Sequence, residues 1–512
     1  MSKEQFKTML LAMLFLLSIT LTQQLWISIP LAENVASSEA VGSNDSQTYD
    51  DIKLIANIVS PQSFIVNFGG GLHTVFYSDS YNVLEGSTQG IWSKTLNLLK
   101  NNYFEENATV EEISREQWVI ANNSRSLLMN FGYSLPFVIL KNMVQAKDVG
   151  IAGKIAEIDS ILIGVVDESE MFMANHATGK YYRLKGISTG SDSFAEVVNY
   201  IEDNEHTVYY GIRDIYGDMI ADNDILESDR LIPVTLKDNV PKIQVVQEID
   251  INNEAQVEAF ASTFFGAGFD FVRRITETNG SVIYMYGYGQ RALKIDETGV
   301  VEYREELEPQ KTVENNGYWE GLTSAVRFVN EHGGWPNKYS YLKDIEEIER
   351  DNKKGHRFIF GYRINGIPVY YNDKLSPEPI EVEVVGKQVI YYKRSIKKEK
   401  IDVDFLEKDD VQVNILTPLQ IIDFNYSNFD IIKSDYLAAL LEKGVEPDEK
   451  EIEREILSSI KSIKFGYYDQ PMREPNKLIP VWIIQFGQYI YYFDAYNGKI
   501  EFRSEAVMDG EE

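Results

Sequence analysis

Histidines and a glycine triplet are the first places where this sequence could do chemistry. No two histidines are two, three or four residues apart, so the spacings that place two imidazoles on one zinc ion are absent: His73, His176, His206, His332 and His356. The triplet Gly69-Gly70-Gly71 could present backbone N–H groups to an anion. No Gly-Lys-Ser or Gly-Lys-Thr follows it, so we predict a tight turn instead, with His73 as an exposed turn residue.

Two further motifs resemble cofactor sites incompletely. The acidic run Asp222–Asp229 offers the oxygen ligands that calcium prefers, but a loop starting at Asp222 has Glu227 where glycine is needed and Pro233 at its twelfth position. Adventitious calcium binding stays open. Gly287-Tyr288-Gly289 resembles the start of a dinucleotide fingerprint, yet the residues after it read as a strand rather than a helix. We therefore expect no cofactor and no dedicated metal site.

Composition narrows the function classes. The 512 residues carry 49 Lys plus Arg against 79 Asp plus Glu, a net charge of −30, which disfavours nucleic-acid phosphates as partners. Cysteine is absent, which excludes disulfides, thiolate metal sites and cysteine nucleophiles. Glycosidase-type carboxylate pairs cannot be recognised by spacing among so many acids, because the two partners come from distant segments. An enzyme is not excluded, but no residue pattern argues for one.

An apolar segment near the N-terminus is long enough to be a membrane helix. Residues 8–29 contain no charged side chain, and 22 residues of helix rise about 33 Å, enough to cross a hydrocarbon layer of roughly 30 Å. Lys3 and Lys7 precede the segment and acidic residues follow it, which predicts a cytoplasmic tail (1–7), a transmembrane helix (8–29) and an extracytoplasmic remainder. The alternative is a signal peptide cleaved after Ala40. Residues 30–48 have the composition of a linker.

One side of this predicted helix collects small and polar residues. At helical periodicity the following residues fall on a single stripe: Thr8, Ala12, Ser18, Thr22 and Gln23. Small side chains let a second helix approach closely, so the stripe is a candidate contact surface for a partner's membrane helix. The alternative is that these residues face lipid.

Beyond the linker, period-two apolar runs and turn signals predict antiparallel sheets with helices packed on them, an α+β class. Its predicted parts are an N-terminal α+β domain (49–160), a β-rich middle domain (161–305) and a C-terminal α+β domain (306–512). Beside the glycine triplet, hairpin turns are predicted at Thr178–Lys180, Asn365-Gly366 and Gly386-Lys387, and the helix in 318–331 should end at Gly333-Gly334.

The middle domain and the end of the chain contain two similar segments. Residues 296–304 (DETGVVEYR) resemble residues 494–503 (DAYNGKIEFR), and each follows a predicted helix, 253–265 or 450–463, and a series of strand-like runs. Both segments read as a strand end, an Asp/Gly turn and a return strand.

The whole pattern resembles the YycH family of Gram-positive bacteria. The resemblance rests on the N-terminal anchor, the SPQSFIVNFGGGLHTVFYSD hairpin, and the segments FGYRINGIPVYYND and LIPVWIIQFGQYIYYFDAYNGKIEFR; the C-terminal half also resembles the related YycI family. The resemblance to YycH implies a non-enzymatic membrane protein that acts, together with a YycI-like partner, on the sensor histidine kinase YycG (WalK). Through the kinase it would adjust cell-wall metabolism, either as an activator or as an inhibitor. A membrane-tethered wall hydrolase and a secreted binding module are the alternatives.

Overall fold

The computed structural model describes a large part of the chain: residues 44–77, 90–104, 108–146, 151, 153–165, 170–186, 194–220, 226–234, 236, 240–308, 317–371, 377–400, 415–426, 432, 434, 452–470 and 476–506. The chain separates into two units, Met1–Tyr49 and Asp50–Glu512. No helix within the described ranges is both long and apolar enough to span a membrane. The predicted span (8–29) and most of the predicted linker lie outside these ranges.

Within Asp50–Glu512 the first sheet is antiparallel and has the strand order β3-β7-β6-β5-β4-β1-β2-β8-β9. Its strands are β1 (Ser63–Gly69), β2 (Leu72–Phe76), β3 (Thr109–Ile113), β4 (Ser126–Pro136), β5 (Glu157–Gly164), β6 (Glu170–Asn175), β7 (Lys180–Lys185), β8 (Tyr209–Gly211) and β9 (Leu231–Pro233). The helices that accompany them are α2 (Asn44–Ile58), α3 (Ile91–Leu98), α4 (Arg115–Asn122), α5 (Phe137–Met143), α6 (Phe194–Asp203) and α7 (Ile212–Tyr216).

Alternation along these strands gives the first sheet two apolar faces. Phe64, Val66 and Leu127 belong to the main core, whereas Ile65 and Leu128, one position along, join a second cluster around the buried Trp118 of α4. Because successive side chains of a strand point to opposite faces, strands that read as continuous apolar runs need a cover on both faces.

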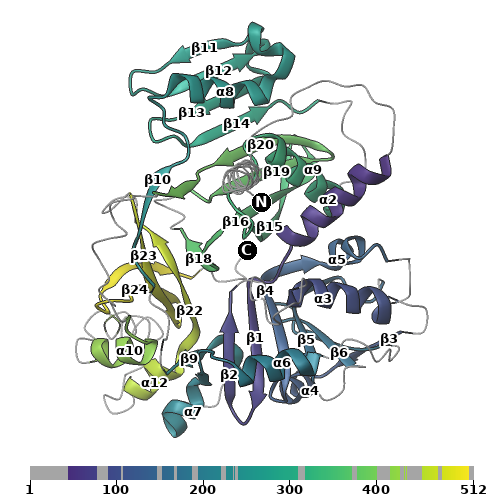
Figure 1. Ribbon diagram of the computed structural model, residues 1–512, viewed down its shortest axis with the longest axis vertical. Coiled ribbons are helices and arrows are strands. Elements are labelled where there is room, and N and C mark those ends of the chain that lie inside the picture. Colours follow the sequence, from purple (N-terminus) through teal and green to yellow (C-terminus); the bar gives the residue numbers. More distant parts are fainter. Residues whose placement is uncertain are drawn as a thin grey trace, which may run out of the picture. The chain divides into compact units, whose positions relative to one another are not determined.

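The central sheet has the order β11-β12-β13-β14-β20-β19-β16-β15 and is also antiparallel. Its strands are β11 (Arg273–Thr276), β12 (Val282–Tyr286), β13 (Arg291–Ile295), β14 (Val301–Glu305), β15 (Tyr341–Arg350), β16 (Lys353–Gly361), β19 (Ile380–Val385) and β20 (Gln388–Arg394). Helix α8 (Glu254–Phe265) packs against β13, and α9 (Tyr318–Glu331) packs against β16, β19 and β20 (Figure 1).

The third sheet contains the C-terminal strands. It has the order β17-β18-β22-β23-β10-β21, with β24 paired to β23 and β25 to β24. Its elements are β10 (Ile243–Gln247), β17 (Arg363–Ile364), β18 (Ile367–Tyr370), β21 (Lys397–Glu399), β22 (Ile460–Asp469), β23 (Lys477–Phe486), β24 (Tyr489–Asp494) and β25 (Ile500–Glu505), with helices α10 (Pro418–Tyr426) and α12 (Ile452–Ser458). β18 and β22 run parallel. The predicted α+β class with antiparallel sheets is confirmed, while the predicted domain boundaries stay predictions.

The predicted hairpins are confirmed at their turns. The glycine triplet joins β1 to β2, and all three glycines have positive φ, which other residues adopt at a cost. Asn365-Gly366 connects β17 to β18, again with positive φ at both residues, as a two-residue hairpin requires. The turns at Gly179 and Gly386 connect β6 to β7 and β19 to β20.

The similarity between residues 296–304 and residues 494–503 is confirmed, because both segments form an Asp/Gly turn between two paired strands. Asp296 comes directly after the last residue of β13: its Oδ1 accepts the Thr298 N–H at 2.8 Å, and its carbonyl accepts the Gly299 N–H at 3.0 Å. Asp494 is the last residue of β24: its Oδ1 accepts the Tyr496 N–H at 2.7 Å and its carbonyl accepts the Gly498 N–H at 2.8 Å. In each case a helix precedes four consecutively paired strands, β11 to β14 after α8 and β22 to β25 after α12.

Two local predictions are wrong. His73 lies inside β2, half-buried and paired with Asn67 and Tyr209, rather than exposed in the turn. The helix predicted over 450–463 ends at Ser458, and β22 begins at Ile460. Ile460 and Ile463 are three residues apart, which suits a helix, but a bulge after Ile460 lets both side chains be buried from a strand.

A buried ion pair joins the central sheet to the third sheet. Arg394 ends β20 and is 1% exposed; its Nε donates to Glu248 Oε2 at 2.6 Å and its Nη2 to Oε1 at 3.0 Å. Arg394 Nη1 also donates to the carbonyl of Gly334, just beyond α9, at 2.7 Å. Glu248 follows β10, and its N–H donates to the Ile396 carbonyl at 2.8 Å. Burial raises the pKa of Glu248, but Arg394 and Lys398 outweigh it and hold that pKa below its ordinary value.

Glu248→Gln should therefore lower the free energy of unfolding by about 3–5 kcal/mol at pH 7, because it leaves a buried guanidinium without its counter-charge. Since the folded-state pKa of Glu248 is depressed, the pair's contribution is present above the unfolded-state pKa and is lost as pH falls through the folded one. Urea unfolding of the full-length protein in mild detergent measures both effects.

The matched control is Glu254→Gln, which removes a surface partner of Arg274 and should cost below about 1 kcal/mol. A difference between wild type and Glu248→Gln that does not shrink between pH 7 and pH 3 would contradict the prediction.

Candidate functional site

The central sheet presents a polar face on the side opposite α8 and α9, which we call the open face. On the helix side, Phe358, Val382 and Tyr392 are buried against the core. One residue along each of the same strands, Arg357, Glu383 and Tyr391 point to the other side. In β16, β19 and β20, alternation of apolar and polar residues therefore gives the sheet one apolar face and one charged face.

Strand register aligns these polar residues into one line across the sheet. Each of its members is the direct cross-strand partner of the next, from β14 through β20, β19 and β16 to β15: Arg304, Tyr391, Glu383, Arg357 and Glu346. We call this line the central row. Opposite charges on directly paired positions attract at this range, so the row stabilises the register that creates it.

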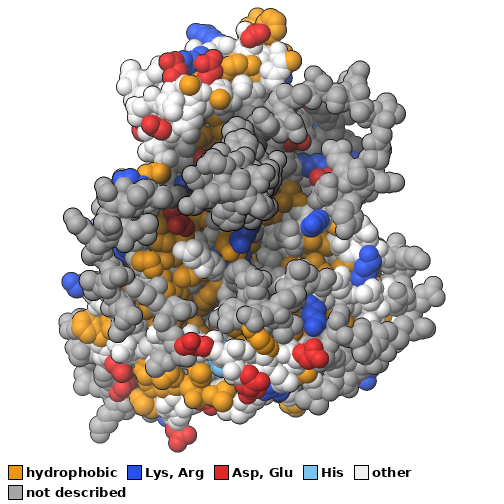
Figure 2. All heavy atoms as spheres, in the orientation of Figure 1, with side chains coloured by type: hydrophobic (Ala, Val, Ile, Leu, Met, Phe, Trp, Pro, Cys, Tyr) orange, Lys and Arg blue, Asp and Glu red, His pale blue; other side chains and the backbone are white. Residues whose placement is uncertain are grey.

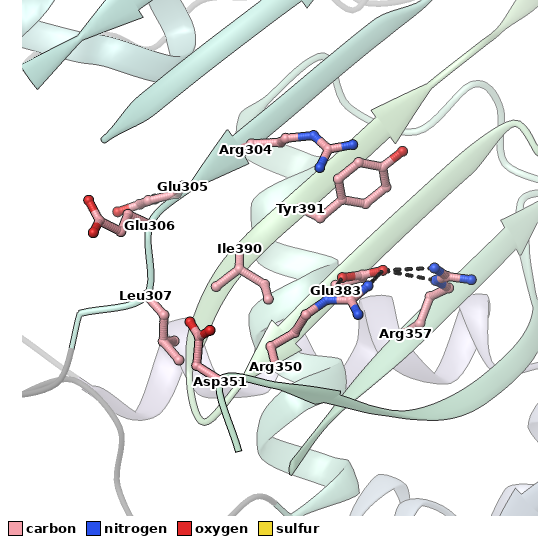
Figure 3. A pocket seen from close by; sticks show the side chains of 10 residues that line it. All are labelled: Arg304, Glu305, Glu306, Leu307, Arg350, Asp351, Arg357, Glu383, Ile390 and Tyr391. Atoms are coloured by element: carbon pink, nitrogen blue, oxygen red, sulfur yellow. Dashed lines mark hydrogen bonds and ion pairs between the residues drawn. The ribbon is translucent and has the colours of Figure 1, made fainter. Parts of the chain in front are cut away.

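Glu383 is the centre of the row. Its side chain is 4% exposed and accepts hydrogen bonds from two arginines (Figure 3). Arg350 approaches with Nε at 3.0 Å and Nη2 at 2.9 Å, and Arg357 with Nε at 3.1 Å and Nη2 at 2.8 Å. Arg357 also donates from Nη1 to Glu346 at 3.1 Å. One buried carboxylate is thus shared by two guanidinium groups, and Glu346 supplies the second negative charge of the network.

A recess of about 390 Å³ opens over the central row. Three arginines, four acids and three other side chains line it, as Figure 3 shows: Arg304, Arg350, Arg357, Glu305, Glu306, Asp351, Glu383, Leu307, Ile390 and Tyr391. The Arg304 guanidinium lies 5.2 Å from the centre of the Tyr391 ring, a cation–π contact. Burial and nearby carboxylates raise the pKa of Tyr391, so its phenol remains a hydrogen-bond donor at neutral pH.

These groups favour recognition over catalysis. The Glu383 carboxylate is occupied by hydrogen bonds from both guanidinium groups. Arg304 and Arg350 retain 70% and 47% of their side-chain exposure. Planar, partly exposed guanidinium groups bind carboxylates in two-point geometry, which suits contact with a charged partner.

None of the described histidines and glycines that the sequence singled out lines this recess. Thr8, Ala12, Ser18, Thr22 and Gln23 lie outside the described residues, as do residues 221–225 of the acidic run. Two of the histidines are packing residues: His332 stacks on Phe328 with ring centres 3.9 Å apart, and His356 lies against Tyr318 at 4.3 Å. Burial lowers the pKa of both, so neither is charged at neutral pH.

Sequence reasoning missed both the central row and a second polar pair. His176 Nδ1 lies 2.6 Å from Asp159 Oδ1, beside the edge of the Trp118 ring. These residues are brought together by the pairing of β5 with β6. The alternating charges of residues 381–394 were a usable signal for the row, but only the strand order places Arg357 and Arg350 on Glu383.

Replacing the shared carboxylate tests the network. Glu383→Gln should reduce the free energy of unfolding by about 2–3 kcal/mol, because two charge-assisted hydrogen-bond pairs are lost and two guanidinium groups are left to repel each other. Glu349→Gln on the neighbouring exposed strand position is the control and should change stability by less than about 0.5 kcal/mol. Adding Arg350→Gln to Glu383→Gln should recover part of the loss; strictly additive losses in this double-mutant cycle would contradict a shared carboxylate.

Comparison with known proteins identifies a matched domain and a shared fold. Residues 242–418 match the family described as YycH protein, C-terminal domain, a segment that contains the whole central sheet and the Arg394–Glu248 pair. No curated protein matches the chain. The crystal structure of YycH from Bacillus subtilis has a similar fold, with a TM-score of 0.50 and 14% sequence identity over 87% of this chain and 96% of that one. The resemblance to YycI stays a prediction. Residues 242–418 therefore match the YycH C-terminal domain, and over most of its length the chain shares the fold of the Bacillus subtilis protein.

Proposed function

We propose that this protein is a membrane-anchored, non-enzymatic regulator of a sensor histidine kinase of the YycG/WalK type, acting with a YycI-like partner to adjust cell-wall metabolism. The observation that carries the proposal is the match of residues 242–418 to the YycH C-terminal domain. The apolar, uncharged segment 8–29 supports the anchor, and the preceding Lys3 and Lys7 support a cytoplasmic N-terminus with the sheets outside the cell.

Such regulation requires only differential packing. If the kinase has two arrangements of its membrane helices, a helix that packs better against one of them shifts the equilibrium by the difference in packing free energy. About 1.4 kcal/mol is a tenfold shift, within reach of a few close helix–helix contacts. The stripe of small and polar residues on segment 8–29 supplies a surface of the kind that permits close approach.

The extracytoplasmic sheets add a second level of contact in this proposal. Tethering a folded body and a membrane helix in one chain raises the effective concentration of each at its own site once the other has bound. The charged open face, with its exposed guanidinium groups, supports a role for this body in recognising the partner rather than in turnover of a substrate.

The stripe can be tested directly. Replacing Thr8, Ala12, Ser18 and Thr22 together by leucine should reduce co-purification of the kinase with the full-length protein and change the output of a kinase-dependent reporter, because bulky side chains keep the two helices apart. Membrane fractionation should show that the variant still inserts, since leucine raises apolarity.

The control carries leucine at Met9 and Met13, which lie off the stripe. Unchanged kinase retention and unchanged reporter output in the stripe variant, relative to this control, would reject the helix mechanism. Intact-mass measurement of the protein extracted from membranes tests the anchor itself: a mature chain beginning after Ala40 would remove the basis of the proposal.

A further inference from the structure

The central row continues beyond the charged network to the far edge of the sheet. Arg304 of β14 is the direct partner of Ala292 on β13, Ala292 pairs with Met285 on β12, and Met285 pairs with Arg273 on β11. The same register therefore runs through all eight strands of the central sheet. On its β11–β14 portion, the row reads cation, apolar, apolar, cation.

The apolar part of the row widens into a strip. Ile275 and Ile283 are cross-strand partners one row away on the same face, so they lie beside Met285 and Ala292. All four side chains are partly exposed, whereas Val282, Tyr284 and Leu293 on the helix side are buried. Phe271, two residues before Arg273, is 79% exposed at the edge of the strip.

The two cations that bound the strip are accessible. The Arg273 guanidinium has no hydrogen-bond or ion-pair partner within the described ranges, and Arg304 is 70% exposed and pairs only with Glu302 and the Tyr391 ring. They stand three strands apart, about 14 Å at the usual strand spacing. On the side of the molecule drawn in Figure 2, the segment that contains β11 to β14 shows both hydrophobic and charged side chains.

We propose that the β11–β14 part of the open face is the docking surface for a protein partner that offers an apolar ridge bordered by two carboxylates about 14 Å apart. The ridge packs on Ile275, Ile283, Met285 and Ala292, and the carboxylates pair with Arg273 and Arg304. This inference rests on the proposed function, because its partners are the kinase and the YycI-like protein named there.

Charge decides between a protein and a membrane as the occupant. The chain carries a net charge of −30, which opposes a lipid surface rich in anionic headgroups. Two discrete arginines at the borders of an apolar strip match instead the anatomy of protein interfaces, in which Arg, Met and aromatic residues are enriched.

The experiment titrates the labelled full-length protein in detergent with the purified full-length kinase and, separately, with the YycI-like protein. Arg273→Glu and Met285→Gln should each weaken binding of at least one partner about tenfold, because the first reverses a bordering cation and the second places an amide within the apolar strip. Lys461→Glu changes an exposed cation on β22 of the third sheet, and Ile120→Gln changes an exposed apolar residue on helix α4; each should alter binding less than about twofold. Thermal unfolding verifies that all four variants fold alike.

A photoreactive amino acid at position 285, with position 120 as its control, identifies what covers the strip. Cross-linking from 285 to the kinase or the YycI-like protein, together with weakened binding of the two variants, supports the inference. Wild-type binding that neither variant changes, or cross-links from 285 only to a second copy of this chain or to lipid, overturns it and leaves the proposed function intact. If neither partner binds the wild-type protein, the proposed function fails and the inference fails with it.

Discussion

The buried pair of Arg394 and Glu248 is the interaction on which the arrangement of the second half of the chain depends. Arg394 belongs to the central sheet, Glu248 follows a strand of the third sheet, and the same guanidinium reaches the carbonyls of Gly333 and Gly334 at the end of α9. A fully buried guanidinium needs both a counter-charge and hydrogen-bond acceptors in fixed places. Satisfying Arg394 therefore sets the position of β10 and of α9 relative to β20, and with it the start of α8 and of the β11–β14 strands.

The open face is a consequence of that arrangement. Helices α8 and α9 occupy the same side of one continuous sheet, so the alternation within each strand sends the second set of side chains to the side opposite them. Register then determines chemistry: Glu383 meets Arg357 because β16 pairs with β19, and Arg304 meets Tyr391 because β14 pairs with β20. A slip of one residue in either pairing would exchange the buried and the polar sets, which is why these ion pairs and the apolar core specify the same register.

Comparison of particular elements shows how far the sequence could predict this structure. The turns at Gly69–Gly71, Asn365-Gly366 and Gly386 were predictable because positive φ selects glycine and asparagine locally. The similarity between residues 296–304 and residues 494–503 was predictable because each segment contains an Asp/Gly turn. His73 was misplaced because β2 begins immediately after the triplet, and Ile460 was misplaced because apolar residues three apart suit a helix as well as a bulged strand. The central row was missed because its members come from five strands whose order the sequence does not reveal.

By itself, the sequence determined the α+β class, the hairpins, the acidic character and the family resemblance, because these depend on residue type and on neighbours within a few positions. Only the tertiary structure decided which strands became partners, that Glu383 serves two arginines, and that Arg273 and Arg304 border one apolar strip. The physical reason is that cross-strand pairing is set by the burial of whole sheet faces and by single buried ion pairs such as that of Arg394, and these contacts link residues that no local pattern connects.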